Sequence, residues 1–564
     1  MKGIHRVLCL LLLSFIAIPS VSTYAVNVWF LGVDNSNPSI GIAMKSRIQI
    51  RQSPSYRVSI HNVEFDKNVV YSFLLAGYAM KYVCGVNIDG IAIDVYIDGR
   101  RQVRGSSASL AYTMAILKAL NKTNITAFSW GATGVTSIDG FIDAVGGLYA
   151  KIEAAKESGL EIVYIPTINA LIYSANSEAP RIVRVTSLAD LCRDLDFNRV
   201  PMKLPPEGFE MVNKFFMYRA IEFLNMSKAL IDKFPIDMRR TVFLEYKNLS
   251  TNVEKVLERG HGYTAASYAF TGYMQILHRY LMLNNSISNY LVDESKNIIE
   301  SALNRFNNFR YIHPSTIPIL VVILDRITEA QFYADLYKNL TQSSIPSRSP
   351  TIVLEAVTRA YTRSLTIDTW LDLLEMVNST MVTNRDCPLI EFNRVYDATL
   401  SVLKAVSLTI EWNQEFAPLS LSAIASVRST LAKQLDEESR LRVANELRKL
   451  YIIHTSYLDD DAKIVPYIYY IYAKDLELDG SSDYISILSM STLIASITNI
   501  INSILSRGGL PIQPEYTEVP LLYNARVVAL FLNIIVAFLL LVLLLHIIEK
   551  SLGSTPSYTI FNRI

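Results

Sequence analysis

The segment GSSAS at residues 105–109 and the segment GGLYAK at residues 146–151 carry the two side chains on which the interpretation of this chain depends. Ser107 lies in the first segment, and Lys151 ends the second. A serine hydroxyl becomes a strong nucleophile only when a base takes its proton, and a lysine is that base at neutral pH only if burial keeps its amine uncharged. The pair therefore predicts a nucleophile and its general base, provided that Lys151 is buried.

The residues around Lys151 predict that its side chain points inward. Gly147 and Gly159 mark the start and the end of a helix over residues 148–158. One face of that helix carries Lys151 together with Leu148, Ile152 and Ala155. A buried amine is one interpretation of this pattern. The alternative is that only the four-carbon stem packs while the ammonium reaches water.

These segments and their neighbours resemble the proteolytic domain of Lon-type proteases. Residues 105–109 are similar to the Lon nucleophile motif, in which a serine precedes alanine and then, in archaeal-type members, a second serine. Residues 132–134, Ala-Thr-Gly, resemble the Lon Met-Thr-Gly segment. Residues 140–151 resemble the stretch that ends in the base lysine, and residues 152–166 continue the pattern into a strand. The resemblance covers roughly residues 26–196.

The resemblance implies a serine endopeptidase. Ser107 would be the nucleophile and Lys151 the general base, with Thr133 as an orienting hydroxyl near the lysine amine. Hydrolysis would proceed through an acyl-enzyme and would need no metal ion or other cofactor. A helix predicted over residues 109–120 begins next to Ser107, so backbone amides at its start would stabilise the oxyanion. Lon proteolytic domains form hexameric rings, so the resemblance also implies a homo-oligomer.

Two differences from Lon enzymes bear on activity. The Walker A pattern of an AAA+ motor, G-x-x-x-x-G-K followed by Ser or Thr, does not occur in this chain, which predicts an ATP-independent peptidase that acts on flexible polypeptides. Lon relatives usually carry an acidic residue at the position of Arg104 or Ser106, and this chain has neither. A second class of function therefore stays open, a catalytically inactive Lon-like surface scaffold whose helical region binds partner proteins.

The two ends of the chain predict an extracytoplasmic protein with a single membrane anchor. Residues 1–25 carry basic residues, then an apolar run and then small residues, as a secretory signal peptide does. Residues 527–548 include only Asn533 and His546 as polar members, and a helix of this length spans a hydrocarbon core of about 30 Å. The expected order is a juxtamembrane linker at 511–526, the transmembrane helix at 527–548 and a cytoplasmic tail at 549–564.

Between these ends the sequence divides into two regions. Residues 26–200 alternate strand and helix signals, which predicts an α+β proteolytic domain. The expected strands cover residues 27–30, 47–52, 56–60, 92–97 and 162–165, and the expected helices cover residues 65–82, 109–120 and 148–158. Prolines and a glycine between residues 201 and 208 mark a boundary. Residues 201–510 carry long helical patterns with little glycine, which predicts an all-α region.

The composition of the chain says little about its partners and its cellular compartment. The chain has 53 basic and 52 acidic residues and a net charge of +1, which provides no field for nucleic acid. Outside the predicted signal peptide, Cys84, Cys192 and Cys387 lack the spacing of zinc or redox motifs, and we expect them to be buried apolar residues.

Other patterns predict structure rather than chemistry. Ser401 and Lys404 form a Ser-x-x-Lys motif without its usual companion motifs, so we interpret them as part of a helix surface. The acidic run 459–461 lacks the rest of a calcium loop and predicts a solvated turn. Aromatic residues gather at 263–280 and 467–472, and we expect them to pack between helices rather than to form a ligand cage.

Overall fold

The computed structural model describes residues 24–34, 36–98, 102–172, 180–193, 205–342, 350–382, 389–410 and 418–507. Residues 1–514 belong to one compact unit and residues 515–564 to a second. The predicted linker, transmembrane helix and cytoplasmic tail lie outside the described residues, as does the predicted signal peptide up to residue 23. Tyr24 and Ala25, its last two predicted residues, begin the first strand.

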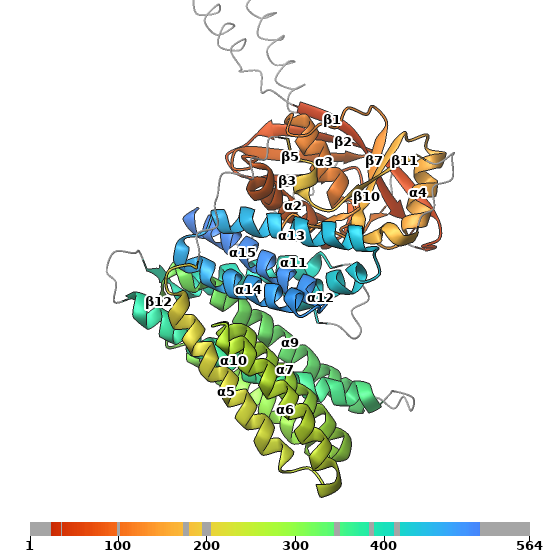
Figure 1. Cartoon of the computed structure of the whole chain (residues 1–564). Helices are drawn as coiled ribbons and strands as arrows, with labels where there is room; N and C mark the ends of the chain where they lie inside the picture. Colours follow the sequence, from red (N-terminus) through yellow and green to blue (C-terminus); the bar gives the residue numbers. More distant parts are fainter. Residues whose placement is uncertain are drawn as a thin grey trace, which may run out of the picture. The chain divides into compact units, whose positions relative to one another are not determined.

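The N-terminal region is built on a mixed seven-stranded sheet with the order β11-β10-β7-β1-β2-β5-β3 (Figure 1). Its strands are β1 (Tyr24–Val33), β2 (Gly41–Gln52), β3 (Arg57–His61), β5 (Ile91–Ile97), β7 (Trp130–Ala132), β10 (Ile162–Pro166) and β11 (Arg181–Val185). The longest pairing joins β1 and β2 antiparallel, with Tyr24 opposite Ile50 and Val33 opposite Gly41. The strands β7, β10 and β11 continue from β1 in parallel. Two-residue ladders β4 (Glu64–Phe65) with β6 (Gln102–Val103) and β8 (Val135–Thr136) with β9 (Ile142–Asp143) complete the region.

Three helices cover the two faces of this sheet. They are α2 (Lys67–Cys84), α3 (Ser109–Ala119) and α4 (Leu148–Glu157). Phe30 of β1 packs in the same apolar cluster as residues of α2 and α3, whereas the next residue, Leu31, packs in a cluster with Leu148 and Ile152 of α4. Successive side chains of a strand point to opposite faces, so α4 covers the face opposite α2 and α3.

The predicted strands and helices of this region are confirmed, with differences at their ends. Each of the three helices lies within two residues of its expected bounds, and β1 and β2 extend beyond theirs because their exposed ends pair with each other. The sequence did not predict β7 and β11, nor the two short ladders. β7 is a three-residue strand with Gly131 at its centre, and such a short segment shows no alternation.

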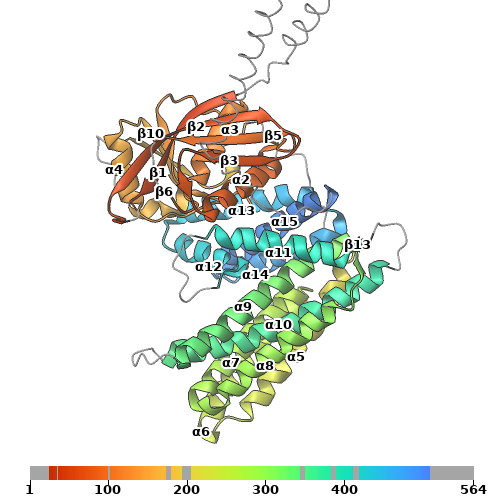
Figure 2. The ribbon, with the colours of Figure 1, turned by 180° about the vertical axis from the view of Figure 1, so that it is seen from behind.

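The C-terminal region is a large helical assembly (Figure 2). Its helices are α5 (Phe209–Ile231), α6 (Ile236–Glu258), α7 (Gly262–Leu283), α8 (Ser288–Phe306), α9 (Ile317–Gln342), α10 (Pro350–Val382), α11 (Phe392–Leu408), α12 (Leu421–Ala432), α13 (Glu437–Ser456), α14 (Ile464–Leu478) and α15 (Tyr484–Ser506). One ladder of β12 (Tyr311–Ile312) with β13 (Ile390–Glu391) interrupts the predicted all-α character. The expected aromatic packing is present, since the Tyr263 ring lies 4.9 Å from the rings of Phe216 and Tyr469.

Helix α15 is the one helix among the described residues that is long and apolar enough to cross a membrane. It contacts α9, α11, α12, α13 and α14. In its most apolar window 89% of the residues are buried, a share that is typical of a core helix. By length and composition alone it is a weak indication of membrane association, and it is distinct from the helix predicted at residues 527–548.

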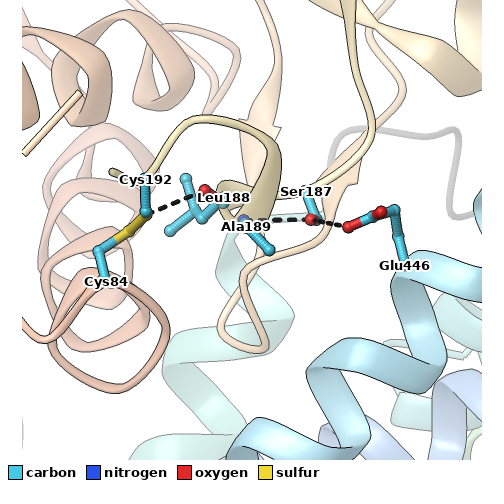
Figure 3. The surroundings of a disulfide bond; sticks show 6 residues. All are labelled: Cys84, Ser187, Leu188, Ala189, Cys192 and Glu446. Atoms are coloured by element: carbon cyan, nitrogen blue, oxygen red, sulfur yellow. Dashed lines mark hydrogen bonds between the residues drawn. A yellow bond between two sulfur atoms is a disulfide. The ribbon is translucent and has the colours of Figure 1, made fainter. Parts of the chain in front are cut away.

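Two of the cysteines that were expected to be buried apolar residues form a disulfide with each other. Cys84 at the end of α2 is bonded to Cys192, with the Cα atoms 5.5 Å apart and a sequence separation of 108 (Figure 3). The single turn η2 (Leu188–Asp190) precedes Cys192, and Ser187 at its N-cap donates a hydrogen bond to Glu446 of α13 at 2.8 Å. The pairing escaped sequence reasoning because neither cysteine lies in a local motif. Cys387 lies outside the described residues.

Candidate active site

Ser107 lies in the turn that leads into α3. Gly105 begins this turn with a φ of +79°, a backbone conformation that favours glycine. Ser107 is half-buried, and its neighbour Ser106 is buried and donates a hydrogen bond to the carbonyl of Thr409 at 2.6 Å. Arg104 is exposed. The turn is thereby tied directly to the helical region, because Thr409 follows α11.

The segment after β7 holds the Ser107 turn from the other side. The amide of Gly134 donates to the carbonyl of Ser107 at 2.9 Å, and the amide of Leu110 donates back to the carbonyl of Gly134 at 3.1 Å. A Cβ atom at position 134 would lie 2.9 Å from side-chain atoms of Leu110 and Ile142. A side chain at position 134 would therefore force Leu110 or Ile142 to shift.

Lys151 is in the first turn of α4, and its side chain is buried. The residue is 3% exposed, and it shares the apolar face of α4 with Leu148 and Ile152, as the spacing predicted. Its amine donates a hydrogen bond to the hydroxyl of Thr133 at 3.2 Å, and Thr133 is fully buried. The alternative in which the ammonium reaches water is therefore wrong for this chain.

The Thr133–Gly134 dipeptide brings the three predicted site residues into one neighbourhood. Thr133 contacts the Lys151 amine through its side chain, and Gly134 contacts Ser107 through its amide. Ser107 comes from the turn before α3, Lys151 comes from α4, and the dipeptide follows β7 between them in the sheet region. A half-buried hydroxyl and a buried amine are thus each in contact with one residue of the same dipeptide.

A buried ion cluster fixes the hairpin that precedes Lys151. Arg428 of α12 is 1% exposed, and its guanidinium donates to both oxygens of Asp139 at 2.7 and 3.1 Å. It also donates to both oxygens of Asp143 at 2.7 and 2.9 Å. Burial is the largest single influence on Asp139 and favours its protonated form, but the charge and hydrogen bonds of Arg428, together with His454 and Thr492, outweigh burial and lower the pKa of Asp139. For Asp143 burial prevails and raises the pKa.

Further contacts from α13 and α15 surround the same hairpin. Thr492 donates to Asp139 at 2.9 Å, and Ser496 donates to the carbonyl of Ile138 at 2.7 Å. Burial lowers the pKa of His454, so its ring is neutral, and Nε2 lies 3.0 Å from the carbonyl oxygen of Asp139. Sequence reasoning missed this cluster because 285 residues separate Asp143 from Arg428.

The remaining candidate motifs occupy structural positions. Ser401 and Lys404 lie on α11, and Lys404 is exposed, which agrees with a helix surface. Asp459 precedes the single turn η6 (Asp460–Lys463), in which Lys463 pairs with Asp460 at 2.7 Å. Among the described residues there is no group of three or more His, Cys, Asp or Glu side chains that could hold a metal ion.

Comparisons with known proteins point to one kind of enzyme over a short segment. The chain is 33% identical over 116 residues to the archaeal Lon protease of Methanothermobacter thermautotrophicus, which is 20% of this chain and 18% of that protein. It is 34% identical over 90 residues to the archaeal Lon protease of Thermoplasma acidophilum, which is 16% of this chain and 14% of that protein. This segment is related to Lon-type proteases. The chain spans less than a fifth of the length of these curated Lon relatives, and no family model matches it.

Proposed function

We propose that this chain is a membrane-anchored, extracytoplasmic, ATP-independent serine endopeptidase in which Ser107 is the nucleophile and Lys151 the general base. The observation that carries the proposal is the buried Lys151 amine, hydrogen-bonded to Thr133 beside the glycine that binds the Ser107 carbonyl. The partial relationship to Lon-type proteases supports the same reaction class.

The chemistry follows from these groups. Burial disfavours the charged form of an amine, so Lys151 is able to take the proton of the Ser107 hydroxyl. The serine oxygen attacks the peptide carbonyl, and backbone amides next to Ser107, before α3 begins, are proposed to stabilise the oxyanion. The lysine returns the proton to the leaving nitrogen as the C–N bond breaks. Water, deprotonated by the same amine, then hydrolyses the acyl-enzyme. Thr133 holds the amine in one orientation throughout.

The disulfide supports the proposed compartment. Structural disulfides persist in oxidising surroundings, and the Cys84–Cys192 bond fits a region outside the cytoplasm. The apolar segments at residues 1–25 and 527–548 supply the proposed signal and anchor. A flexible polypeptide is the proposed substrate because a chain without a motor does not unfold its substrates.

Labelling of the full chain with a fluorophosphonate probe, together with casein cleavage, tests the proposal. We expect the wild type to react with the probe and to cleave casein, and we expect Ser107→Ala and Lys151→Ala to do neither. Ser401→Ala and Lys404→Ala, which change the Ser-x-x-Lys surface of α11, are the matched controls and should behave as the wild type. Equal labelling of wild type and Ser107→Ala would show that the proposal is wrong.

The second candidate function is an inactive Lon-like scaffold. The observation that favours it is the absence of an acidic residue at positions 104 and 106, where the chain carries an exposed arginine and a serine bound to Thr409. If the chain is a scaffold, replacing Ser107 leaves its partner binding unchanged, and neither the wild type nor the variant cleaves casein.

The proposed hexameric ring is tested separately, by the mass of the detergent-solubilised full chain in light scattering.

A further inference from the structure

Two buried serines flank Ser107 and close its turn. Ser106 is 1% exposed and Ser109 is fully buried, whereas Ser107 between them is half-buried. The amide of Ser109 donates to the carbonyl of Ser106 at 3.0 Å, and the Ser109 hydroxyl donates to the same carbonyl at 2.8 Å. The Ser109 hydroxyl also accepts the amide of Thr136 at 2.8 Å. The second half of the turn is therefore fixed to the sheet region.

The first half of the turn is held from the helical region. The Ser106 hydroxyl donates to the carbonyl of Thr409 at 2.6 Å, on the short side of the range for such bonds. Gly105, with its φ of +79°, directly precedes Ser106. Glycine allows many backbone conformations, so the hydrogen bond to Thr409 restricts a part of the turn that the backbone itself leaves flexible.

Thr409 is a well-fixed acceptor because it follows the end of α11. Its amide and its hydroxyl both donate to the carbonyl of Val406, at 3.0 and 2.8 Å. The helix itself contacts α2 of the sheet region as well as α9 and α15. The last carbonyls of a helix lack partners within the helix and carry partial negative charge. A buried hydroxyl donor such as that of Ser106 satisfies one of them.

The amine that faces this turn is positioned by other contacts. Lys151 is held by the hydroxyl of Thr133 at 3.2 Å and by the apolar face of α4. A shift of the turn would therefore change the position of the Ser107 hydroxyl relative to an amine that stays in place. Misplacement of a reacting group by about 1 Å can cost roughly a hundredfold in rate.

We propose that Ser106 is a positioning residue for the nucleophile, through which the helical region sets the orientation of Ser107 for attack. The inference rests on the proposed peptidase function and adds that the helical region takes part in the reaction. The alternative is that the bond to Thr409 only stabilises the packing of the two regions. The two roles predict different rates of reaction at Ser107.

The rate of fluorophosphonate labelling of the full chain in detergent separates the two roles. Ser106→Ala removes the donor and keeps Ser107 and Lys151. We expect the rate constant of labelling to fall at least about tenfold, while the fraction of protein that is finally labelled stays as in the wild type. For casein we expect kcat to fall with KM little changed, because Ser106 is too deeply buried to contact a substrate.

Ser295→Ala is the matched control. Ser295 of α8 is also buried and donates its hydroxyl to the carbonyl of Ala360 in α10 at 2.9 Å. The control thus loses the same kind of hydrogen bond within the helical region, without touching the Ser107 turn. We expect Ser106→Ala and Ser295→Ala to lower the thermal unfolding midpoint to a similar extent, and only Ser106→Ala to slow labelling.

A second variant covers the case in which Ser106→Ala does not fold. Ser106→Cys keeps a side chain of similar size with a weaker donor, so its labelling rate should lie between those of the wild type and Ser106→Ala. Its comparison with the wild type then decides the question alone.

Each unfavourable result has a distinct meaning. An unchanged labelling rate in the folded Ser106 variants overturns the proposal, and so does equal slowing in Ser295→Ala. A smaller labelled fraction that reacts at the wild-type rate also overturns it, because that result describes partial unfolding. If the wild type itself takes no label, the proposed peptidase is wrong and the role of Ser106 falls with it. A reactive wild type beside a folded but slow Ser106→Ala supports both.

Discussion

Replacing Arg428 by methionine is expected to destabilise the folded chain by about 3–5 kcal/mol, because it leaves buried carboxylates without their cation. The guanidinium makes four hydrogen bonds to Asp139 and Asp143, between 2.7 and 3.1 Å. At about 1.5–3 kcal/mol for each charged hydrogen bond the sum would be roughly 6–12 kcal/mol. The expected cost is smaller than this sum because the raised pKa of Asp143 allows that carboxyl to become protonated.

Urea unfolding of the full chain in detergent, followed by tryptophan fluorescence, measures this cost. Trp130 is buried at 1% exposure and should report the loss of the N-terminal region. The matched variant Arg428→Met with Asp139→Asn and Asp143→Asn should recover most of the lost stability, because neutral amides do not require a cation.

The stability lost in the single variant Arg428→Met should depend on pH in a defined direction. The folded pKa of Asp139 is lowered, so in the wild type its contribution is present above the unfolded pKa of about 4 and is lost as the pH falls through the folded pKa. Arg428→Met should therefore be most damaging near pH 7 and less so below about pH 4. A cost below about 1 kcal/mol at pH 7, or a cost that does not fall with pH, would refute this account of the cluster.

Three further predictions concern single contacts of the N-terminal region. Thr133→Val should lower kcat for casein at least about tenfold while leaving the fold intact, because Lys151 loses its hydrogen-bond acceptor. Thr133→Ser keeps a hydroxyl and should retain most activity. Equal kcat in the wild type and both variants would contradict the orienting role of Thr133. Gly134→Ala should cost about 1–3 kcal/mol in urea unfolding, because its Cβ would lie 2.9 Å from side chains of α3 and β9; an unchanged midpoint contradicts the close approach. Replacing both Cys84 and Cys192 by serine should cost about 2–4 kcal/mol under oxidising conditions. A reducing agent should then destabilise only the wild type, and an equal effect on both proteins would argue against the bond.

The elements that sequence predicted well are those with a strong local period. Helix α4 was expected because two glycines bound it and an apolar face runs along it, and its bounds differ by one residue. The same pattern predicted that Lys151 is buried, although a lysine on an apolar face also permits exposure of its amine. The three-residue strand β7 had no such period, and its place in the sheet comes from pairing with β1 and β10.

Contacts between distant segments could not be predicted in this way. Arg428 occupies a helix whose periodicity explains its apolar neighbours but does not reveal that two carboxylates from the N-terminal region complete its surroundings. The disulfide was missed for the same reason, since the sequence separation of its cysteines is 108. Both features depend on tertiary packing, and the spacing of residues along a single sequence does not reveal such contacts.

The bond between Ser106 and the carbonyl of Thr409 has a practical consequence for recombinant work. A fragment that stops at residue 200 would remove the carbonyl of Thr409 that accepts from the Ser107 turn, and also Arg428, which pairs with Asp139. Such a truncated product would expose this polar surface to water and would lack the contacts that hold the Ser107 turn and Asp139 in the intact chain. A shortened version of the chain for recombinant work should therefore extend at least through residue 507, where the described helices end.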